Sequence, residues 1–81
     1  MTYDQEIVDG VTINRFRGIP LVTVLPDGRV LFNTDGKRSG EIFDTMNKML
    51  YDSGKEIRVV NNHVKNSKGE WTELQDGMVV D

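Results

Sequence analysis

The side chains that could carry out chemistry in this chain are one histidine, several carboxylates and a group of basic residues. The 81 residues include no cysteine, so disulfides, thiolate metal sites and thiol nucleophiles are excluded for this chain. His63 lies in a segment that predicts a strand, and no residue stands at metal-ligand spacing beside it. No serine lies in a recognisable nucleophile elbow, and no spacing forces two carboxylates together. We therefore expect no catalytic residue, no metal and no cofactor.

Basic residues gather between two acidic ends, although the net charge is −3. Residues 11–38 contain five basic and two acidic side chains, whereas residues 1–10 and 70–81 contain acidic side chains and no basic one. The five basic residues are Arg15, Arg17, Arg29, Lys37 and Arg38. Arg15 and Arg17 share one side of an expected strand. Lys37 and Arg38 precede an expected helix, and the N-terminus of a helix favours anions. The tentative binding residues are therefore Arg15, Arg17, Lys37 and Arg38; the alternative is ordinary solvated surface.

The loop at residues 34–40 could bind an anion, because two glycines stand immediately before the expected helix. The loop lacks the complete phosphate-binding pattern. The alternative is that its glycines only permit the turn.

A hairpin at residues 18–33 organises the first half of the chain. Two apolar segments flank Pro26-Asp27-Gly28, a sequence typical of a tight turn. If the residues on either side of this turn pair, one face of the hairpin carries Val22, Val24, Val30 and Phe32. That apolar face needs a cover.

The preceding segment, residues 11–17, alternates as a strand does, with Val11 and Ile13 expected to face inward. Phe16 is out of phase with them, and we expect a bulge near Asn14 or Arg15 to turn it inward. Residues 1–9 either add an edge strand or stay loose.

Residues 39–54 predict an amphipathic helix. Ser39 is the expected N-cap and Gly54 the expected stop. The apolar stripe consists of Ile42, Phe43, Met46, Met49 and Leu50. We expect Phe43, Met46 and Leu50 to cover the hairpin, and Asp44 to pair with Lys48 at helical spacing.

Two further strands are expected after the helix, at residues 57–64 and 70–74, and residues 78–80 either pair briefly with a sheet edge or fray. The order strand-strand-strand-helix-strand-strand predicts one small α+β domain over residues 1–81, with the helix on one face of an antiparallel sheet. Residues 1–9 and 75–81 are the segments expected to be loosest.

Trp71 has two interpretations. It packs in the core beside Val60, because a lone tryptophan is often the largest core residue of a small domain. Alternatively, it is an exposed anchor at an interface, where tryptophan is enriched.

Half of the chain carries a pattern that resembles small uncharacterised proteins of bacteriophages and prophages. The matching residues are Leu31-Phe32-Asn33-Thr34-Asp35-Gly36-Lys37-Arg38-Ser39, Met46-Asn47 and Gly69-Glu70-Trp71. The chain departs from the family pattern at Lys37, Gly40 and Thr45, and the last departure removes a cation that would favour nucleic acid. The resemblance implies a phage or prophage origin and no particular activity.

These features predict a small non-enzymatic binding protein, a phage-encoded effector that binds a host or defence protein in the bacterial cytoplasm. No apolar segment approaches the length of a membrane span. The alternative is a nucleic-acid-binding protein that uses the basic residues, with Phe16 or Trp71 as a stacking surface. The acidic net charge favours the protein partner, because phosphate neutralisation dominates nucleic-acid affinity.

Overall fold

The computed structural model describes residues 2–81. Its elements, in chain order, are β1 (Asp4–Val8), β2 (Val11–Phe16), β3 (Ile19–Val24), β4 (Val30–Phe32), α1 (Gly40–Asp52), β5 (Arg58–Val60), β6 (His63–Lys65), β7 (Trp71–Glu73) and β8 (Val79–Val80). None of the helical residues described forms a segment long and apolar enough to span a bilayer.

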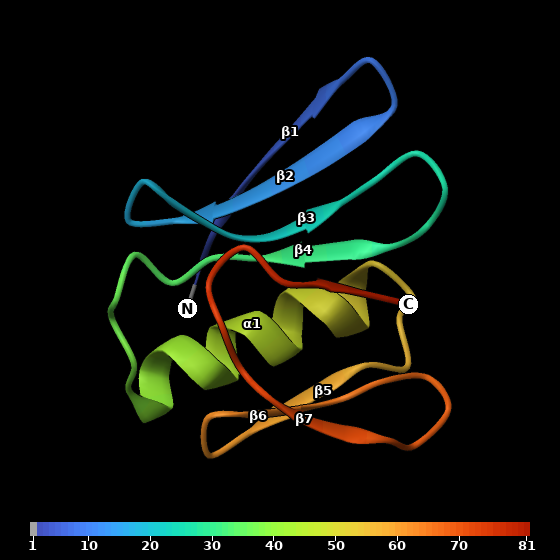
Figure 1. Cartoon of the computed structure of the whole chain (residues 1–81). Helices are drawn as coiled ribbons and strands as arrows, with labels where there is room; N and C mark the ends of the chain where they lie inside the picture. The colour runs from blue at the N-terminus through green and yellow to red at the C-terminus, as the bar shows by residue number, and fades with distance from the viewer. Residues whose placement is uncertain (1) are drawn as a thin grey trace.

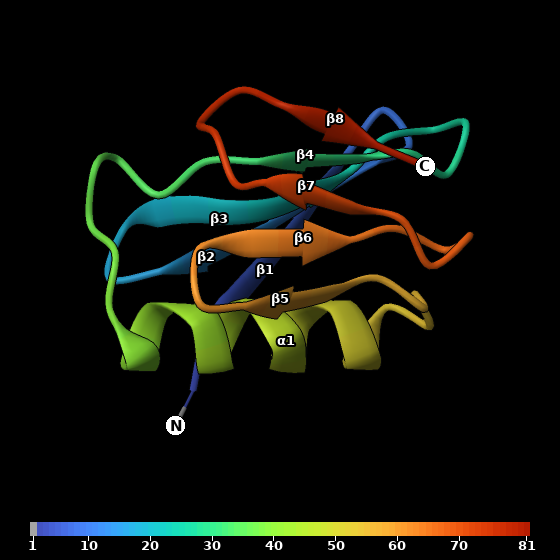
Figure 2. The same ribbon diagram turned by 60° about the horizontal axis from the view of Figure 1, so that its bottom comes forward.

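The elements form two layers (Figure 1). One layer is the large sheet, with the strand order β1-β2-β3-β4-β8; the small sheet, β5-β6-β7, is separate from it. Figure 2 shows α1 beside β5, so that helix and small sheet together cover one face of the large sheet. The expected α+β class is confirmed, but the single sheet is wrong, because the first three strands after the helix, β5, β6 and β7, pair with one another and only β8 joins the large sheet.

The core lies between these layers. Its buried apolar side chains are Phe16, Ile19, Leu21, Val22, Val30, Phe32 and Val80 from the large sheet, Ile42, Met46, Met49 and Leu50 from α1, and Ile57, Val59, Val64 and Leu74 from the small sheet and its flanks. Residues near both ends of the chain join the large sheet, as β1 and β8.

The predicted hairpin is confirmed in its register. Val22 pairs with Phe32 and Val24 with Val30, and a 2.8 Å backbone hydrogen bond joins the residues that flank the turn. Val22, Val30 and Phe32 are fully buried, whereas Val24 is partly buried against the core. The alternation of apolar residues was therefore sufficient to identify the inner face of this hairpin.

The predicted inner face of β2 is wrong. Asn14, which pairs with Val22, is completely buried, whereas Val11 and Ile13 are only partly buried on the outer face. The buried amide of Asn14 is satisfied: it donates to the Val22 carbonyl at 3.0 Å and accepts from Gln5 at 3.0 Å. A polar residue can therefore occupy a core position that the apolar pattern assigned to its neighbours.

A bulge is present at the expected place, but its extra residue is on β3. Asn14 pairs with Val22 and Phe16 with Ile19, so that two residues of β3 lie opposite one of β2. Phe16 therefore faces inward by regular alternation from Asn14. The bulge also explains why the consecutive residues Leu21 and Val22 are both completely buried.

The expected single strand at residues 57–64 is instead a tight hairpin. Asn61 and Asn62 have φ values of 46° and 72°, the left-handed conformations that a two-residue type I′ turn requires. Val60 pairs with His63 across this turn. The adjacent asparagines were the sequence signal for the turn, because asparagine tolerates this conformation better than most residues.

Helix α1 begins and ends as predicted. The Ser39 hydroxyl accepts from the Ile42 amide at 3.3 Å, and Gly54 follows the helix with φ 72°. Met46 and Leu50 are completely buried, but Phe43 is only partly buried, and Thr45 occupies the core instead. The expected ion pair is also replaced, since Lys48 pairs with Asp52 at 3.4 Å rather than with Asp44.

Candidate functional site

Two of the predicted basic residues already have acidic partners. Arg15, on the outer face of β2, lies 2.7 Å from a carboxylate oxygen of Glu6. Arg17, in the turn after β2, lies 2.9 Å from Glu41 in the first turn of α1. The end of β2 thus does approach the helix N-terminus, as the prediction required. Both guanidinium groups therefore already have an acidic partner. Lys37 is exposed, and its side chain forms no ion pair with any residue from 2 to 81.

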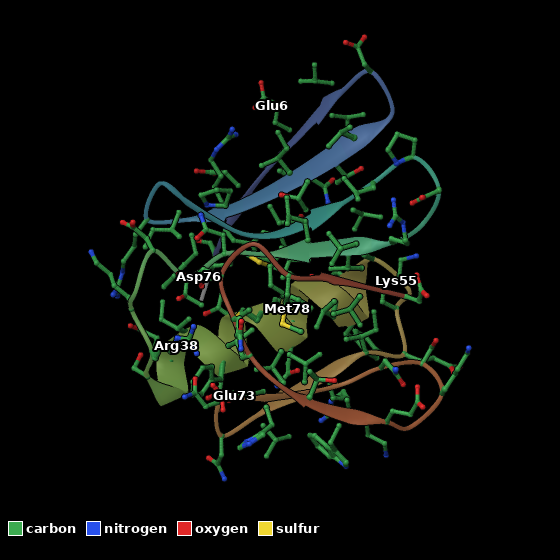
Figure 3. All side chains as sticks on the ribbon, in the orientation of Figure 1. Glu6, Arg38, Lys55, Glu73, Asp76 and Met78 are labelled. Carbon is green, nitrogen blue, oxygen red and sulfur yellow. The ribbon has the colours of Figure 1, made fainter. Side chains whose placement is uncertain are left out.

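Arg38 joins separate parts of the chain rather than facing a partner. Its guanidinium donates to the Leu74 carbonyl at 2.6 Å and to the Asn62 side chain at 2.8 Å, and lies 3.7 Å from Asp76 (Figure 3). These contacts connect the loop before α1 to the turn of the small sheet and to the segment before β8. We therefore assign Arg38 a structural role.

The loop at residues 34–40 does hold an anion, but the anion is the protein's own Asp76. One carboxylate oxygen accepts from the Thr34 amide and hydroxyl, both at 2.8 Å, and the other accepts from the Gly36 amide at 3.1 Å. Partial burial opposes ionisation, but the hydrogen bonds from Thr34 and Gly36, with the charge of Arg38, hold the pKa of Asp76 below its ordinary value. An external anion would have to displace this carboxylate.

Trp71 lies on the surface. Its side chain is on the outer face of the small sheet with 54% of its area exposed, so the core interpretation is wrong. The inner face of this sheet is filled by Val59 and Val64, both 1% exposed, with Leu74 at its end. The aliphatic residues leave no space for an indole between the layers.

Trp71 belongs to a row of three side chains across the outer face. Arg58 pairs with Lys65, and Lys65 pairs with Trp71. The ammonium nitrogen of Lys65 lies 5.9 Å from the centre of the Trp71 ring, within the range of a cation–π contact. A second row, parallel to it, consists of Val60, His63 and Glu73. We call these six residues the outer face of the small sheet.

The first row places two positive charges side by side. Like charges directly opposite on neighbouring strands destabilise a sheet, and neither Arg58 nor Lys65 forms an ion pair with any residue from 2 to 81. Both are exposed. An acidic group from outside the chain would relieve this repulsion.

The second row contains the chain's one histidine. His63 is exposed, and its Nδ1 lies 2.9 Å from the carbonyl oxygen of Asn61. Among residues 2–81, no three histidine, aspartate or glutamate side chains are grouped so that they could hold a metal ion. This face thus carries one aromatic ring, two cations, the partly exposed Val60, the imidazole of His63 and the carboxylate of Glu73.

A shallow groove of about 480 Å³ continues from this face along the contact between α1 and β5. Its lining includes Tyr51, which is 83% exposed, and Arg58. On its floor, the Asn47 side chain donates to the Val59 carbonyl and accepts from the Val59 amide, both at 2.8 Å. The amide of Asn47 thus takes the place of a neighbouring strand at the edge of β5.

Trp71 is a candidate that the sequence predicted, whereas Arg58 and Lys65 were not predicted as binding residues. Alternation along residues 57–64 did place Arg58 and Val60 on the same side. The expectation of a single strand gave no indication that Lys65 lies beside Arg58, because the two residues become neighbours only when the chain reverses at Asn61-Asn62.

Comparison of the chain with protein-family models, curated proteins and solved structures gives no match.

Proposed function

We propose that the chain is a small non-enzymatic binding protein whose outer face of the small sheet docks on an acidic surface of another protein. The observation that carries this proposal is the row Arg58–Lys65–Trp71, which combines two unpaired cations with a half-exposed indole. Tryptophan and arginine are enriched among the residues that dominate binding energy at protein interfaces. In this proposal, Trp71 is the anchor and the cations select an acidic partner.

The resemblance to phage proteins supplies the biological setting of the proposal. In that setting, the chain is a phage-encoded effector, and its partner is a host or defence protein in the bacterial cytoplasm. The predicted residues Arg15, Arg17 and Arg38 contribute little to binding here, because Glu6, Glu41 and Asp76 already lie beside them.

A second candidate is binding of single-stranded nucleic acid on the same face. The specific observation in its favour is the same row, since a base could stack on Trp71 while Lys65 and Arg58 contact phosphates. Glu73 on that face and the net charge of −3 oppose it, because affinity for a polyanion grows with the number of phosphates neutralised. The protein partner is therefore our first choice.

The test begins with capture of proteins from nuclease-treated host lysate on the immobilised chain, followed by affinity measurement with each purified captured protein. We expect Trp71→Ala to weaken the specific complex by about thirtyfold or more, as loss of an interface anchor does. Arg58→Glu with Lys65→Glu should abolish it. Two controls away from this face, Val79→Ala for an exposed apolar side chain and Lys37→Glu for a cation without an ion pair, should retain it.

The same variants separate the two candidates. Binding of a single-stranded oligonucleotide that falls steeply with salt, and that Trp71→Ala removes, would support the nucleic-acid candidate and overturn the protein one. Equal loss of protein capture in the variants and in both controls would show that the outer face has no specific role.

A further inference from the structure

The large sheet ends in an uncovered edge at β1. This strand is five residues long, every residue in it is exposed, and it pairs with β2 on one side only. The other three sheet edges among residues 2–81 offer less free backbone. Asn47 occupies the edge of β5, and the edge strands β7 and β8 are only three and two residues long. An edge strand carries a row of backbone groups that another strand can pair with.

The side chains of β1 have a distinct chemistry on each face. Asp4 and Glu6 point to the outer face of the large sheet, because they pair with the outer-facing Arg15 and Ile13. Figure 3 shows Glu6 on this strand, at the end of the molecule opposite the small sheet. Ile7 points to the inner face and is 68% exposed, since no other element covers it.

The acidic residues determine what can pair with this edge. A parallel, in-register copy of β1 would place Asp4 against Asp4 and Glu6 against Glu6. An antiparallel copy centred on Glu6 would also bring the two Glu6 carboxylates together. Like charges directly opposite destabilise such pairs, so both of these registers are disfavoured for a second copy of the chain. A strand with basic residues at alternate positions would meet attraction instead.

We propose that β1 accepts an extended basic segment of another protein as a sixth strand of the large sheet. Lysine or arginine side chains of that segment would lie opposite Asp4 and Glu6, and an apolar side chain at the position opposite Ile7, next to the one that faces Glu6, would cover Ile7. Arg15 already holds Glu6 in position at 2.7 Å, and the carboxylate still has a second oxygen to offer. This mode gives affinity through the backbone and specificity through alternate side chains. The site is separate from the outer face of the small sheet and does not depend on it.

The experiment uses the full chain and a fluorescently labelled peptide of alternating lysine and valine, titrated by anisotropy. A glutamate–valine peptide of the same length is the charge control. We expect the basic peptide to bind at least about tenfold more tightly than the acidic one. The double variant Asp4→Lys, Glu6→Lys should reverse this preference. Trp71→Ala should leave the preference for the basic peptide unchanged. A loss of peptide binding at β1 can therefore be told apart from a loss of binding at the outer face of the small sheet.

Strand addition is separated from simple charge attraction by peptide methylation. Successive backbone amides of a strand point to opposite edges. N-methyl groups on the peptide amides that face β1 should therefore abolish binding, whereas N-methyl groups on the amides that face away from β1 should be tolerated. Amide hydrogen exchange in β1 should slow when the basic peptide binds. Equal binding of both methylated peptides, or no preference between the basic and acidic peptides, would overturn the proposal.

Discussion

At the scale of single residues, the role and burial of several side chains differ from what the residue type alone predicts. Arg38 belonged to the predicted binding patch, yet it binds the Leu74 carbonyl and the Asn62 side chain of its own chain. Trp71, the largest apolar side chain, lies at the surface with 54% of its area exposed. Asn14, in contrast, is completely buried. For Asn14, the partners Val22 and Gln5 allow burial, because a satisfied polar group can be buried at modest cost. For Trp71, the aliphatic Val59 and Val64 fill the inner face of the sheet instead.

Asn47 offers a sharp test at this scale. Replacing it by Ala leaves the Val59 amide and carbonyl without their side-chain partner, which should lower the free energy of unfolding by ~1–3 kcal/mol. Urea denaturation measures the change. The matched control is Lys48→Ala, one residue along the same helix, whose exposed ion pair with Asp52 contributes little. Equal midpoints for both variants would contradict the role given to Asn47.

Asp76 should make stability depend on pH. Its folded pKa lies below the ordinary value of 3.8, so the ionised carboxylate stabilises the fold above that pH. This contribution is lost as the pH falls through the folded pKa. Asp76→Asn should therefore destabilise the protein at pH 7 and reduce the further loss of stability on acidification below about pH 4. Urea midpoints from pH 7 to pH 2 measure this, and an unchanged acid profile would argue against the Asp76 contacts.

At the scale of elements, α1 was predicted well and β2 was not. The helix has several independent signals: a cap, a stop and an apolar stripe with helical period. For β2, alternation allowed either set of alternate residues to face the core, and the apolar Val11 and Ile13 favoured the wrong set. The phase is set by pairing with β3, where the bulge places both Leu21 and Val22 in the core.

The helix stripe gives a ranking that can be measured. Met46 is completely buried and Phe43 only partly, so Met46→Ala should cost ~2–5 kcal/mol and Phe43→Ala clearly less. The larger side chain thus has the smaller effect, because the cost follows the buried volume that is lost. Thermal unfolding of the two variants compares them, and a lower melting temperature for Phe43→Ala would show that the helix is rotated from the orientation described.

At the scale of the whole molecule, the two layers are joined near the C-terminus. Asp76 binds the loop before α1, β8 pairs with β4, and Val80 lies in the core at 8% exposure. The seven residues after Leu74 therefore hold the edge of the large sheet against the rest of the chain, although their composition suggested a loose tail.

Removing residues 75–81 should prevent stable folding. The truncated chain lacks the Asp76 carboxylate and the buried Val80, and a domain of this size has little stability in reserve. Circular dichroism and urea denaturation would detect the loss. The point control Val79→Ala, at a position that is 44% exposed, should fold as the full chain does. Cooperative unfolding of the truncated chain at an unchanged midpoint would refute this role.

The sequence by itself determined the elements whose signals are local. The central hairpin and its register follow from a turn between two alternating segments, and α1 follows from its cap and its period. The predicted class, α+β, follows from the order of those elements. All of these depend on residues close together in the chain, so local conformational preference is enough to specify them.

Only the tertiary structure decided how the strands outside the central hairpin pair and which charged side chains have an acidic partner. Lys65 meets Arg58 and Trp71 because a turn at Asn61-Asn62 reverses the chain. Asp76 reaches Thr34 across 42 positions of sequence. The outer face of the small sheet and the contacts of Asp76 are arrangements of this kind. Their residues become neighbours only when the core is packed, because burial of the apolar faces selects one pairing among the many that local preference allows.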